Sequence, residues 1–137
     1  MSLDEVVVEA DGGSRGNPGP AGYGAVVIEA ETGEVLVERD GYLGVTTNNV
    51  AEYSGLIAGL TAARDLGATR VRVRMDSRLV VEQMTGQWKV RHAGLKPLAA
   101  QARQLVAAFS TVDFSWIPRA DNVRADALAN RAMDRGR

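Results

Sequence analysis

The chain has 137 residues, of which 45% are hydrophobic and 24% are charged, so it is long enough to form one globular domain with one core. It contains no cysteine and one histidine, His92, which excludes disulfides, thiolate chemistry and zinc sites built from cysteine and histidine. The net charge is −1, but the charges are unevenly distributed. Residues 1–60 hold ten acidic and two basic residues, whereas residues 61–137 hold seven acidic and fourteen basic ones. This asymmetry suggests an acidic locus beside a basic surface.

Three strands are predicted in the first third of the chain. Residues 5–11 have a strand-forming composition and run into residues 12–22, which are rich in turn residues. Residues 23–28 and 35–42 are predicted to be the second and third strands, separated by a short turn. Short turns rich in glycine between three strands indicate an antiparallel meander.

A long helix is predicted next, beginning with a cap among Thr46 to Asn49 and ending at Gly67. The apolar residues that recur at spacings of three and four are Val50, Tyr53, Ile57 and Leu60. Gly55 and Gly59 interrupt the helix at a cost of about 1 kcal/mol each relative to alanine. Together with Ala51 and Ala63 they form a strip of small residues, which predicts close packing of this helix on a sheet.

The second half of the chain alternates between strands and helices. Residues 70–75 predict a half-buried strand, and Ser77 can cap a helix that stops by Gly86. After a loop, residues 95–109 predict an amphipathic helix and residues 112–116 a last strand.

A terminal helix is predicted after a cap at Asp121 or Asn122. The complete order predicts an α/β fold with a mixed five-stranded sheet, in which three antiparallel strands precede two parallel ones and helices cover both faces. We expect one domain over residues 1–137.

Four carboxylates lie where different elements begin or end. Asp11 ends the first strand, Glu52 lies in the first turn of the long helix, Asp76 ends the fourth strand and Asp126 lies early in the last helix. They can share one pocket if the first and fourth strands are neighbours, because sites of α/β sheets form where strand ends meet helix starts.

Such a carboxylate cluster predicts a site for hard divalent cations. Two ions would neutralise four carboxylates, and two-metal sites catalyse displacement at phosphorus. Phosphodiester hydrolysis is therefore the chemistry that the pattern favours. Beside Asp11, the glycines Gly12 and Gly13 match neither a P-loop nor a dinucleotide motif. They are typical of a tight turn, or of a place where a polymer backbone approaches the metal site.

Four ordered motifs resemble those of the type I ribonucleases H. They are Asp11-Gly-Gly-Ser with Gly16-Asn-Pro-Gly19, Thr47-Asn-Asn-Val-Ala-Glu52, Met75-Asp-Ser77 and Ala125-Asp-Ala-Leu-Ala129. The resemblance covers nearly the whole chain and implies the ribonuclease H-like fold. It also implies sequence-independent cleavage of the RNA strand of RNA/DNA hybrids, with two Mg²⁺ ions or Mn²⁺ as a substitute, leaving 5′-phosphate and 3′-hydroxyl ends.

The resemblance also implies roles for individual residues. The four carboxylates would bind the catalytic metal ions, with Glu52 near the RNA 2′-hydroxyl. Asn17 and Thr47 would hold a phosphate of the DNA strand, whereas Asn48, Asn49 and Arg78 would face the minor groove. That groove is wide and shallow in such duplexes and displays the 2′-hydroxyls of the RNA.

The chain departs from the family pattern in two places. Many relatives have a histidine in the loop before the last catalytic aspartate, but here Arg119 is the nearest candidate for an auxiliary role, and His92 lies in another segment. Arginine cannot act as a general base at neutral pH, although it can hold a phosphate. The loop after the second helix is also shorter and less basic than in some relatives.

Alternative interpretations are another nuclease of the ribonuclease H-like superfamily, a noncatalytic module that binds RNA/DNA hybrids, and a relative of the sugar kinases, for which no phosphate loop is found. The chain lacks a signal segment and any apolar run near the roughly 20 residues of a membrane span. We therefore expect a cytoplasmic monomer with no membrane partner and no small-molecule cofactor. Related domains occur fused to phosphatase-like partners, so the chain could be the N-terminal domain of a longer protein.

Overall fold

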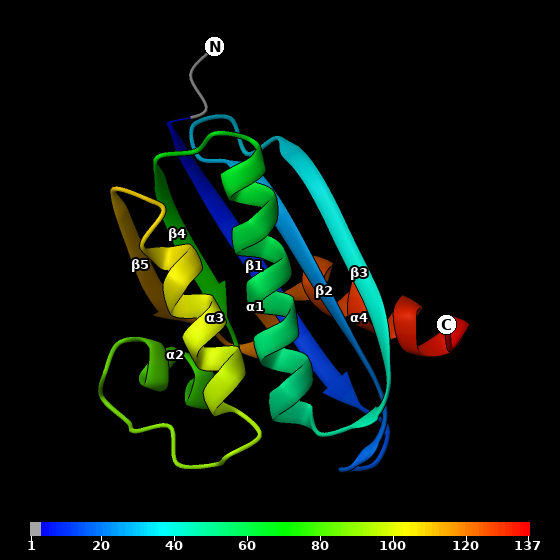
Figure 1. Cartoon of the computed structure of the whole chain (residues 1–137). Coiled ribbons are helices and arrows are strands. Elements are labelled where there is room, and N and C mark those ends of the chain that lie inside the picture. The colour runs from blue at the N-terminus through cyan, green and yellow to red at the C-terminus, as the bar shows by residue number, and fades with distance from the viewer. Residues whose placement is uncertain (1–3) are drawn as a thin grey trace.

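The strands and helices follow the predicted order in the computed structural model, which describes residues 4–137 (Figure 1). Residues 1–3 of the expected domain lie outside this range. The elements are β1 (Glu5–Ser14), β2 (Gly19–Glu29), β3 (Val35–Thr46), α1 (Asn48–Asp65), β4 (Arg70–Met75), α2 (Arg78–Met84), α3 (Lys96–Val106), β5 (Thr111–Trp116), a short 3-10 turn (Arg119–Asp121) and α4 (Val123–Arg135). No helix within residues 4–137 is long and apolar enough to cross a membrane.

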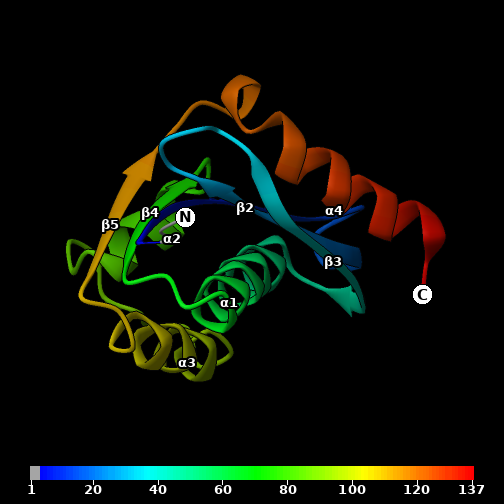
Figure 2. The ribbon, with the colours of Figure 1, turned by 90° about the horizontal axis from the view of Figure 1, so that it is seen from above.

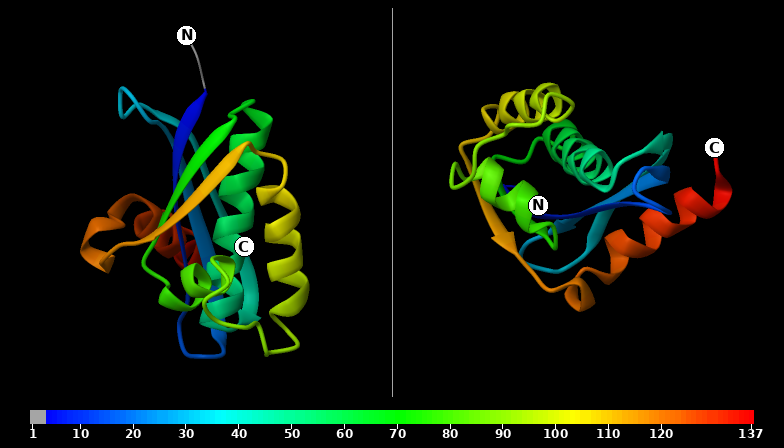
Figure 3. Two further views of the ribbon diagram at one scale, coloured as in Figure 1. Left: turned by 90° about the vertical axis from the view of Figure 1, so that its left-hand side faces the viewer. Right: turned by 90° about the horizontal axis from the view of Figure 1, so that it is seen from below.

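The described strands form one mixed sheet in the order β3-β2-β1-β4-β5. The first three strands pair antiparallel, whereas β4 runs parallel to both β1 and β5. Helices α1 and α3 cover one face and α4 crosses the other (Figure 2), while α2 lies near the end of the sheet where β4 stops (Figure 3). The predicted α/β class, strand directions and placement of helices on both faces are confirmed. The strands β1 and β4 are neighbours, which is the condition under which the four predicted carboxylates can share one pocket.

Alternation along β1 divides the core between the two faces. Val6 and Val8 are fully buried under α1, whereas Val7 packs with a smaller cluster beneath α4. The larger cluster includes the big buried side chains of α1, which are Tyr53, Leu56 and Leu60. Burying apolar area contributes about 25 cal/mol per Å², so this face supplies most of the driving force for folding.

The first two strands are longer than predicted, and the expected turn at residues 12–22 is wrong over most of its length. β1 continues to Ser14 and β2 begins at Gly19, which leaves residues 15–18 as the turn. The glycines within these strands allow close contact with helices. A Cβ on Gly12 would lie 2.1 Å from the carbonyl carbon of Ala51 in α1, and one on Gly24 would lie 2.4 Å from the carbonyl oxygen of Ala125 in α4.

The strip of small residues on α1 packs on the sheet, as predicted. A Cβ on Gly55 would lie 2.5 Å from the carbonyl oxygen of Asp11, and one on Gly59 would lie 2.4 Å from a methyl carbon of Val8. The contact at Gly55 is with backbone, which cannot rotate away. The helix therefore approaches β1 most closely beside Asp11.

We predict that Gly55→Ala destabilises the fold by about 1–3 kcal/mol, although alanine is the better helix former by about 1 kcal/mol. The added methyl group would push α1 away from β1. Urea unfolding measures the change in the free energy of unfolding. Ala58→Gly in the same helix is the comparison, because it should lose about 1 kcal/mol of helix propensity together with the contact of one partly buried methyl group. A more stable Gly55→Ala variant would contradict the close approach.

Candidate active site

Three of the four predicted carboxylates meet at one end of the sheet. Asp11 lies in β1, Glu52 lies just after the first turn of α1, and Asp76 lies directly after β4. Each offers an oxygen atom, and these atoms all lie within 4.8 Å of one another. The convergence follows from the parallel pairing of β1 with β4 and from the packing of α1 on β1.

Asp11 and Glu52 are both buried, and their environment is only partly polar. The backbone N–H of Gly12 donates a 2.6 Å hydrogen bond to one carboxylate oxygen of Glu52. The other oxygen, Oε2, is buried and has no hydrogen-bond partner within residues 4–137. Because an unpaired buried oxygen is costly, this atom is suited to receive a ligand.

Burial raises the pKa of both Asp11 and Glu52, because the charged forms lose contact with water. For Asp11, the neighbouring carboxyl groups of Glu52, Asp76 and Asp126 raise the pKa further. For Glu52, the charge of Asp76 also raises the pKa, whereas the hydrogen bonds from Asp11 and Gly12 oppose the shift. Without a cation, the pair therefore retains a proton that it must release when a metal ion binds.

Asn122 occupies the predicted cap position of α4, but its side chain serves the site. It precedes α4, but its side chain makes no capping hydrogen bond. It is fully buried, and its Nδ2 donates to the carbonyl oxygen of Ala10 at 2.9 Å and to Oδ1 of Asp76 at 3.3 Å. Asn122 thus orients Asp76 from the opposite side of the sheet. Asparagine before a helix usually indicates a cap, so the sequence held no separate signal for this role.

Asp11, Glu52 and Asp76 are the three inner carboxylates. Asp126 lies beside them, but it is not part of the group of described residues whose oxygens all lie within 4.8 Å of one another. It lies in the first turn of α4 and lines the same cavity. Asn130 Nδ2 donates to Asp126 Oδ2 at 3.2 Å, and a guanidinium nitrogen of Arg119 is 3.6 Å from Oδ1. Asp126 nevertheless comes close enough to Asp11 to raise the pKa of the Asp11 carboxyl, so the structure brings all four predicted carboxylates to one cavity.

The cavity has a volume of about 520 Å³ and is strongly charged. The lining residues are Asp11, Gly12, Gly13, Ser14, Arg15, Asn48, Glu52, Asp76, Ser77, Arg119, Asp126, Ala129, Asn130 and Met133. Of the predicted substrate-binding residues, Gly12, Gly13 and Asn48 are in this lining, as is Arg119. The space beside Gly12 is partly filled by the backbone of α1.

Asn17 and Asn48 connect the β1–β2 turn and the end of β1 to the start of α1. Asn17 Oδ1 accepts from the backbone N–H of Asn48 at 3.1 Å, and Asn48 Oδ1 accepts from both the N–H and the hydroxyl of Ser14 at 2.8 Å. Thr47 caps α1 by accepting from the N–H of Val50, and Asn49 is exposed in the first turn. These residues form one polar rim beside the cavity.

Arg78 follows Ser77 of the cavity lining and lies against the aromatic ring of Trp116. Its guanidinium carbon is 4.7 Å from the ring centroid of Trp116 at the end of β5. Trp116 Nε1 donates to the carbonyl oxygen of Asp76 at 3.1 Å. His92, by contrast, is exposed and accepts from the N–H of Gly94, in agreement with the expected surface position.

The clustered oxygens, the unpaired Oε2 of Glu52 and the absence of cysteine together fit a hard divalent cation. Asp11, Glu52 and Asp76 would hold it, and Asp126 could contribute to a second ion. The sequence has no cysteine, and its one histidine, His92, lies outside the cavity lining, so the usual ligands of a zinc site are not found here.

Comparison with known proteins agrees with this geometry. A family model described as reverse transcriptase-like matches residues 9–132. The bifunctional protein Rv2228c of Mycobacterium tuberculosis is 60% identical over 130 residues, which cover 95% of this chain. The chain spans only 36% of the length of that relative.

Two solved structures resemble the whole chain. The N-terminal RNase H domain of Rv2228c, solved as a fusion with maltose binding protein, has a TM-score of 0.95 and 58% identity, and the match covers 98% of this chain and 96% of that one. LC11-RNase H1 in complex with an RNA/DNA hybrid has a TM-score of 0.89 and 43% identity, with coverage of 95% and 97%. With four matching motifs, the same fold and these identities, the chain belongs to the type 1 ribonuclease H family.

Proposed function

We propose that this chain is an endonuclease that hydrolyses the RNA strand of RNA/DNA hybrids, independently of sequence, and leaves 5′-phosphate and 3′-hydroxyl ends. The observation that carries the proposal is the buried group of Asp11, Glu52 and Asp76, with oxygens within 4.8 Å, in a chain of the ribonuclease H family. The proposal includes two Mg²⁺ ions, for which Mn²⁺ can substitute, and a cytoplasmic monomer without a small-molecule cofactor.

Divalent ions bound by the four carboxylates would activate a water and stabilise the leaving oxygen of an in-line displacement. The residues of the chain prepare this site. Gly12 donates its N–H to Glu52, Asn122 orients Asp76, and Asn130 positions Asp126. Because these partners are set before substrate binds, little reorganisation is needed during the reaction.

The polar rim supports a hybrid as the substrate. Asn48 and Asn49 begin α1 one turn before Glu52, so a minor groove lying over them would bring the 2′-hydroxyls toward the carboxylates. The fold is similar to that of a protein solved in complex with an RNA/DNA hybrid, which supports the same class of partner. Asn17 and Thr47, at the base of this rim, are the proposed contacts to the DNA strand.

A gel with end-labelled hybrid, duplex RNA, duplex DNA and single strands tests the proposal. We expect cleavage only of the RNA in the hybrid, with Mg²⁺ present and not with chelator. Asp76→Asn should lower the rate by about a hundredfold or more, because it removes an anionic ligand without changing the shape of the side chain. Hybrid binding without any cleavage by the wild-type chain would instead indicate a noncatalytic binding module.

The raised pKa values predict an unusual effect of pH on stability. The folded state holds protons that the unfolded chain releases, so this contribution is complete below the ordinary pKa values of 3.8 for Asp11 and 4.5 for Glu52 and is lost as pH rises. In chelator, the free energy of unfolding should fall by about 1–3 kcal/mol between about pH 5 and 8.

Denaturant unfolding across this pH range, with and without Mg²⁺, measures the effect. Mg²⁺ should restore stability at the upper pH, since it binds the ionised carboxylates of the folded state. Asp11→Asn should flatten the profile in chelator. An equally steep profile in this variant would assign the effect to other groups.

Arg119→Ala should slow turnover about tenfold without abolishing it, because Arg119 can hold a phosphate or position Asp126 but cannot take a proton. Single-turnover cleavage of the hybrid measures the rate. Arg119→Lys is the control that retains the positive charge. A loss as large as that of Asp76→Asn would show that Arg119 acts more directly in the chemical step.

A further inference from the structure

The cavity has a second end that the carboxylates do not occupy. From Asp11 it continues along Gly12, Gly13 and Ser14 to Arg15, at the start of the turn between β1 and β2. The opposite wall is formed by α4, through Ala129, Asn130 and Met133. The cavity is therefore acidic at one end and has a single arginine at the other.

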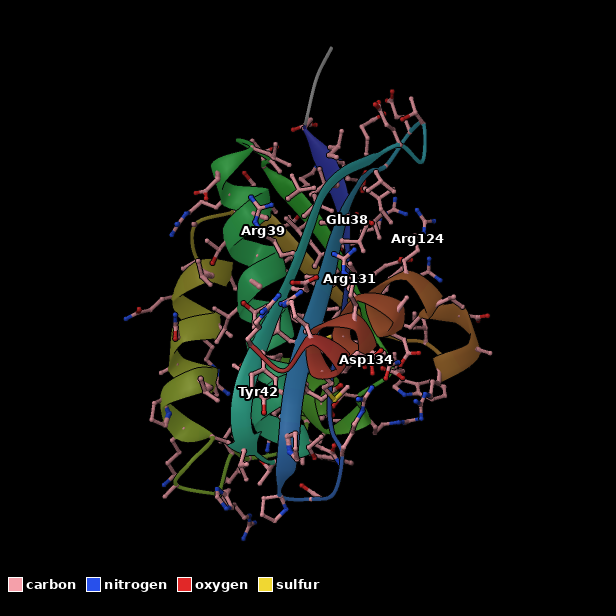
Figure 4. All side chains as sticks on the ribbon, turned by 90° about the vertical axis from the view of Figure 1, so that its right-hand side faces the viewer. Glu38, Arg39, Tyr42, Arg124, Arg131 and Asp134 are labelled. Carbon is pink, nitrogen blue, oxygen red and sulfur yellow. The ribbon has the colours of Figure 1, made fainter. Side chains whose placement is uncertain are left out.

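Arg15 bridges the two walls. One of its guanidinium nitrogens lies 2.6 Å from Oδ1 of Asp134 and 3.5 Å from the backbone carbonyl oxygen of Asn130. Asp134 lies near the end of α4, on a different side of the helix from Arg131, which pairs with Asp40 of β3 (Figure 4). The guanidinium is thus held over the cavity by α4, away from the three inner carboxylates.

The ion pair between Arg15 and Asp134 is too exposed to stabilise the fold appreciably. The side chains are 47% and 68% exposed, and pairs of this kind contribute about 0–1 kcal/mol. An incoming phosphate can replace Asp134, because guanidinium groups bind phosphate through two parallel hydrogen bonds. The arrangement holds Arg15 in an extended position at little cost and leaves it available to an anion.

We infer that Arg15 binds a phosphate of the RNA strand at a fixed number of nucleotides from the cleaved bond. This inference rests on the proposed function, which places the RNA strand along the carboxylates. The continuous cavity then guides the same strand past Gly13 toward Arg15, with Met133 as an apolar wall beside the ribose. A Cβ on Gly13 would make ordinary contact with the Met133 methyl group at 3.6 Å, so the glycine leaves room for one more methyl-sized group between the two walls.

Positional interference tests the inference. End-labelled hybrids carry one uncharged methylphosphonate linkage in the RNA strand, and cleavage is stopped at less than one cut per molecule. The uncharged linkage itself will be cut poorly. In addition, the wild-type chain should cut one other bond about three- to tenfold less, and this bond should always lie the same number of nucleotides from the uncharged linkage. On the gel this bond appears as a gap in the ladder of cleavage products. The gap should disappear in Arg15→Ala, because that variant has already lost the phosphate contact.

The chain contains a matched control in Arg64. Its ion pair with Asp65, at the end of α1, has side chains 50% and 64% exposed and lies outside the cavity. Arg64→Ala should keep the wild-type ladder, and Arg15→Lys should keep part of the gap. Hybrid affinity should also depend less steeply on salt in Arg15→Ala, by roughly one unit in the logarithmic slope.

Three outcomes would overturn the inference. They are a gap that persists in Arg15→Ala, a gap that also disappears in Arg64→Ala, and a gap that arises only when the uncharged linkage is in the DNA strand. Failure of the proposed function itself would be seen differently, since the wild-type chain would then cut no hybrid and give no ladder.

Discussion

The close approach of α1 to β1 is the constraint on which the site depends. Gly12 and Gly55 leave no side chain between the two backbones, so the first turn of the helix lies against the end of the strand. The N–H of Gly12 then reaches Glu52, and Glu52 is buried beside Asp11. A longer separation would let water reach both carboxylates, which would lower their pKa toward ordinary values and reduce their need for a cation.

Helix α4 makes an equivalent approach from the opposite face. Gly24 lets the backbone at Ala125 contact β2, so that Asp126 begins its helix at the cavity. Asn122, just before that helix, reaches across to Ala10 and Asp76. Two helices on opposite faces are thus fixed by glycines of two adjacent strands, and both deliver polar side chains to one end of the sheet. This is why the site needs the whole fold and not one motif.

The sequence predicted the elements and the three inner carboxylates because hydrophobic period, caps and strand ends are local signals. It did not predict that Gly12 and Gly13 lie within a strand, because glycines in series are also typical of turns. The role of Asn122 was missed for a related reason. An asparagine that caps a helix and one that donates hydrogen bonds to buried groups look the same in the sequence. Arg15 was not distinguishable from other arginines until α4 was placed beside it.

The uneven charge of the chain has a structural explanation that the sequence only suggested. Parallel pairing sets Arg70, Arg72 and Arg74 of β4 beside the acidic residues near the start of the chain, forming the ion pairs Arg70 with Asp4, Arg72 with Glu5 and Arg74 with Glu9. Much of the basic excess is thereby neutralised within the sheet. The inner carboxylates, by contrast, have no arginine, lysine or histidine within 4.0 Å among residues 4–137. Because three charges this close repel one another and resist burial, the cation that balances them has to come from solution. Metal binding is therefore coupled directly to the stability of this end of the fold.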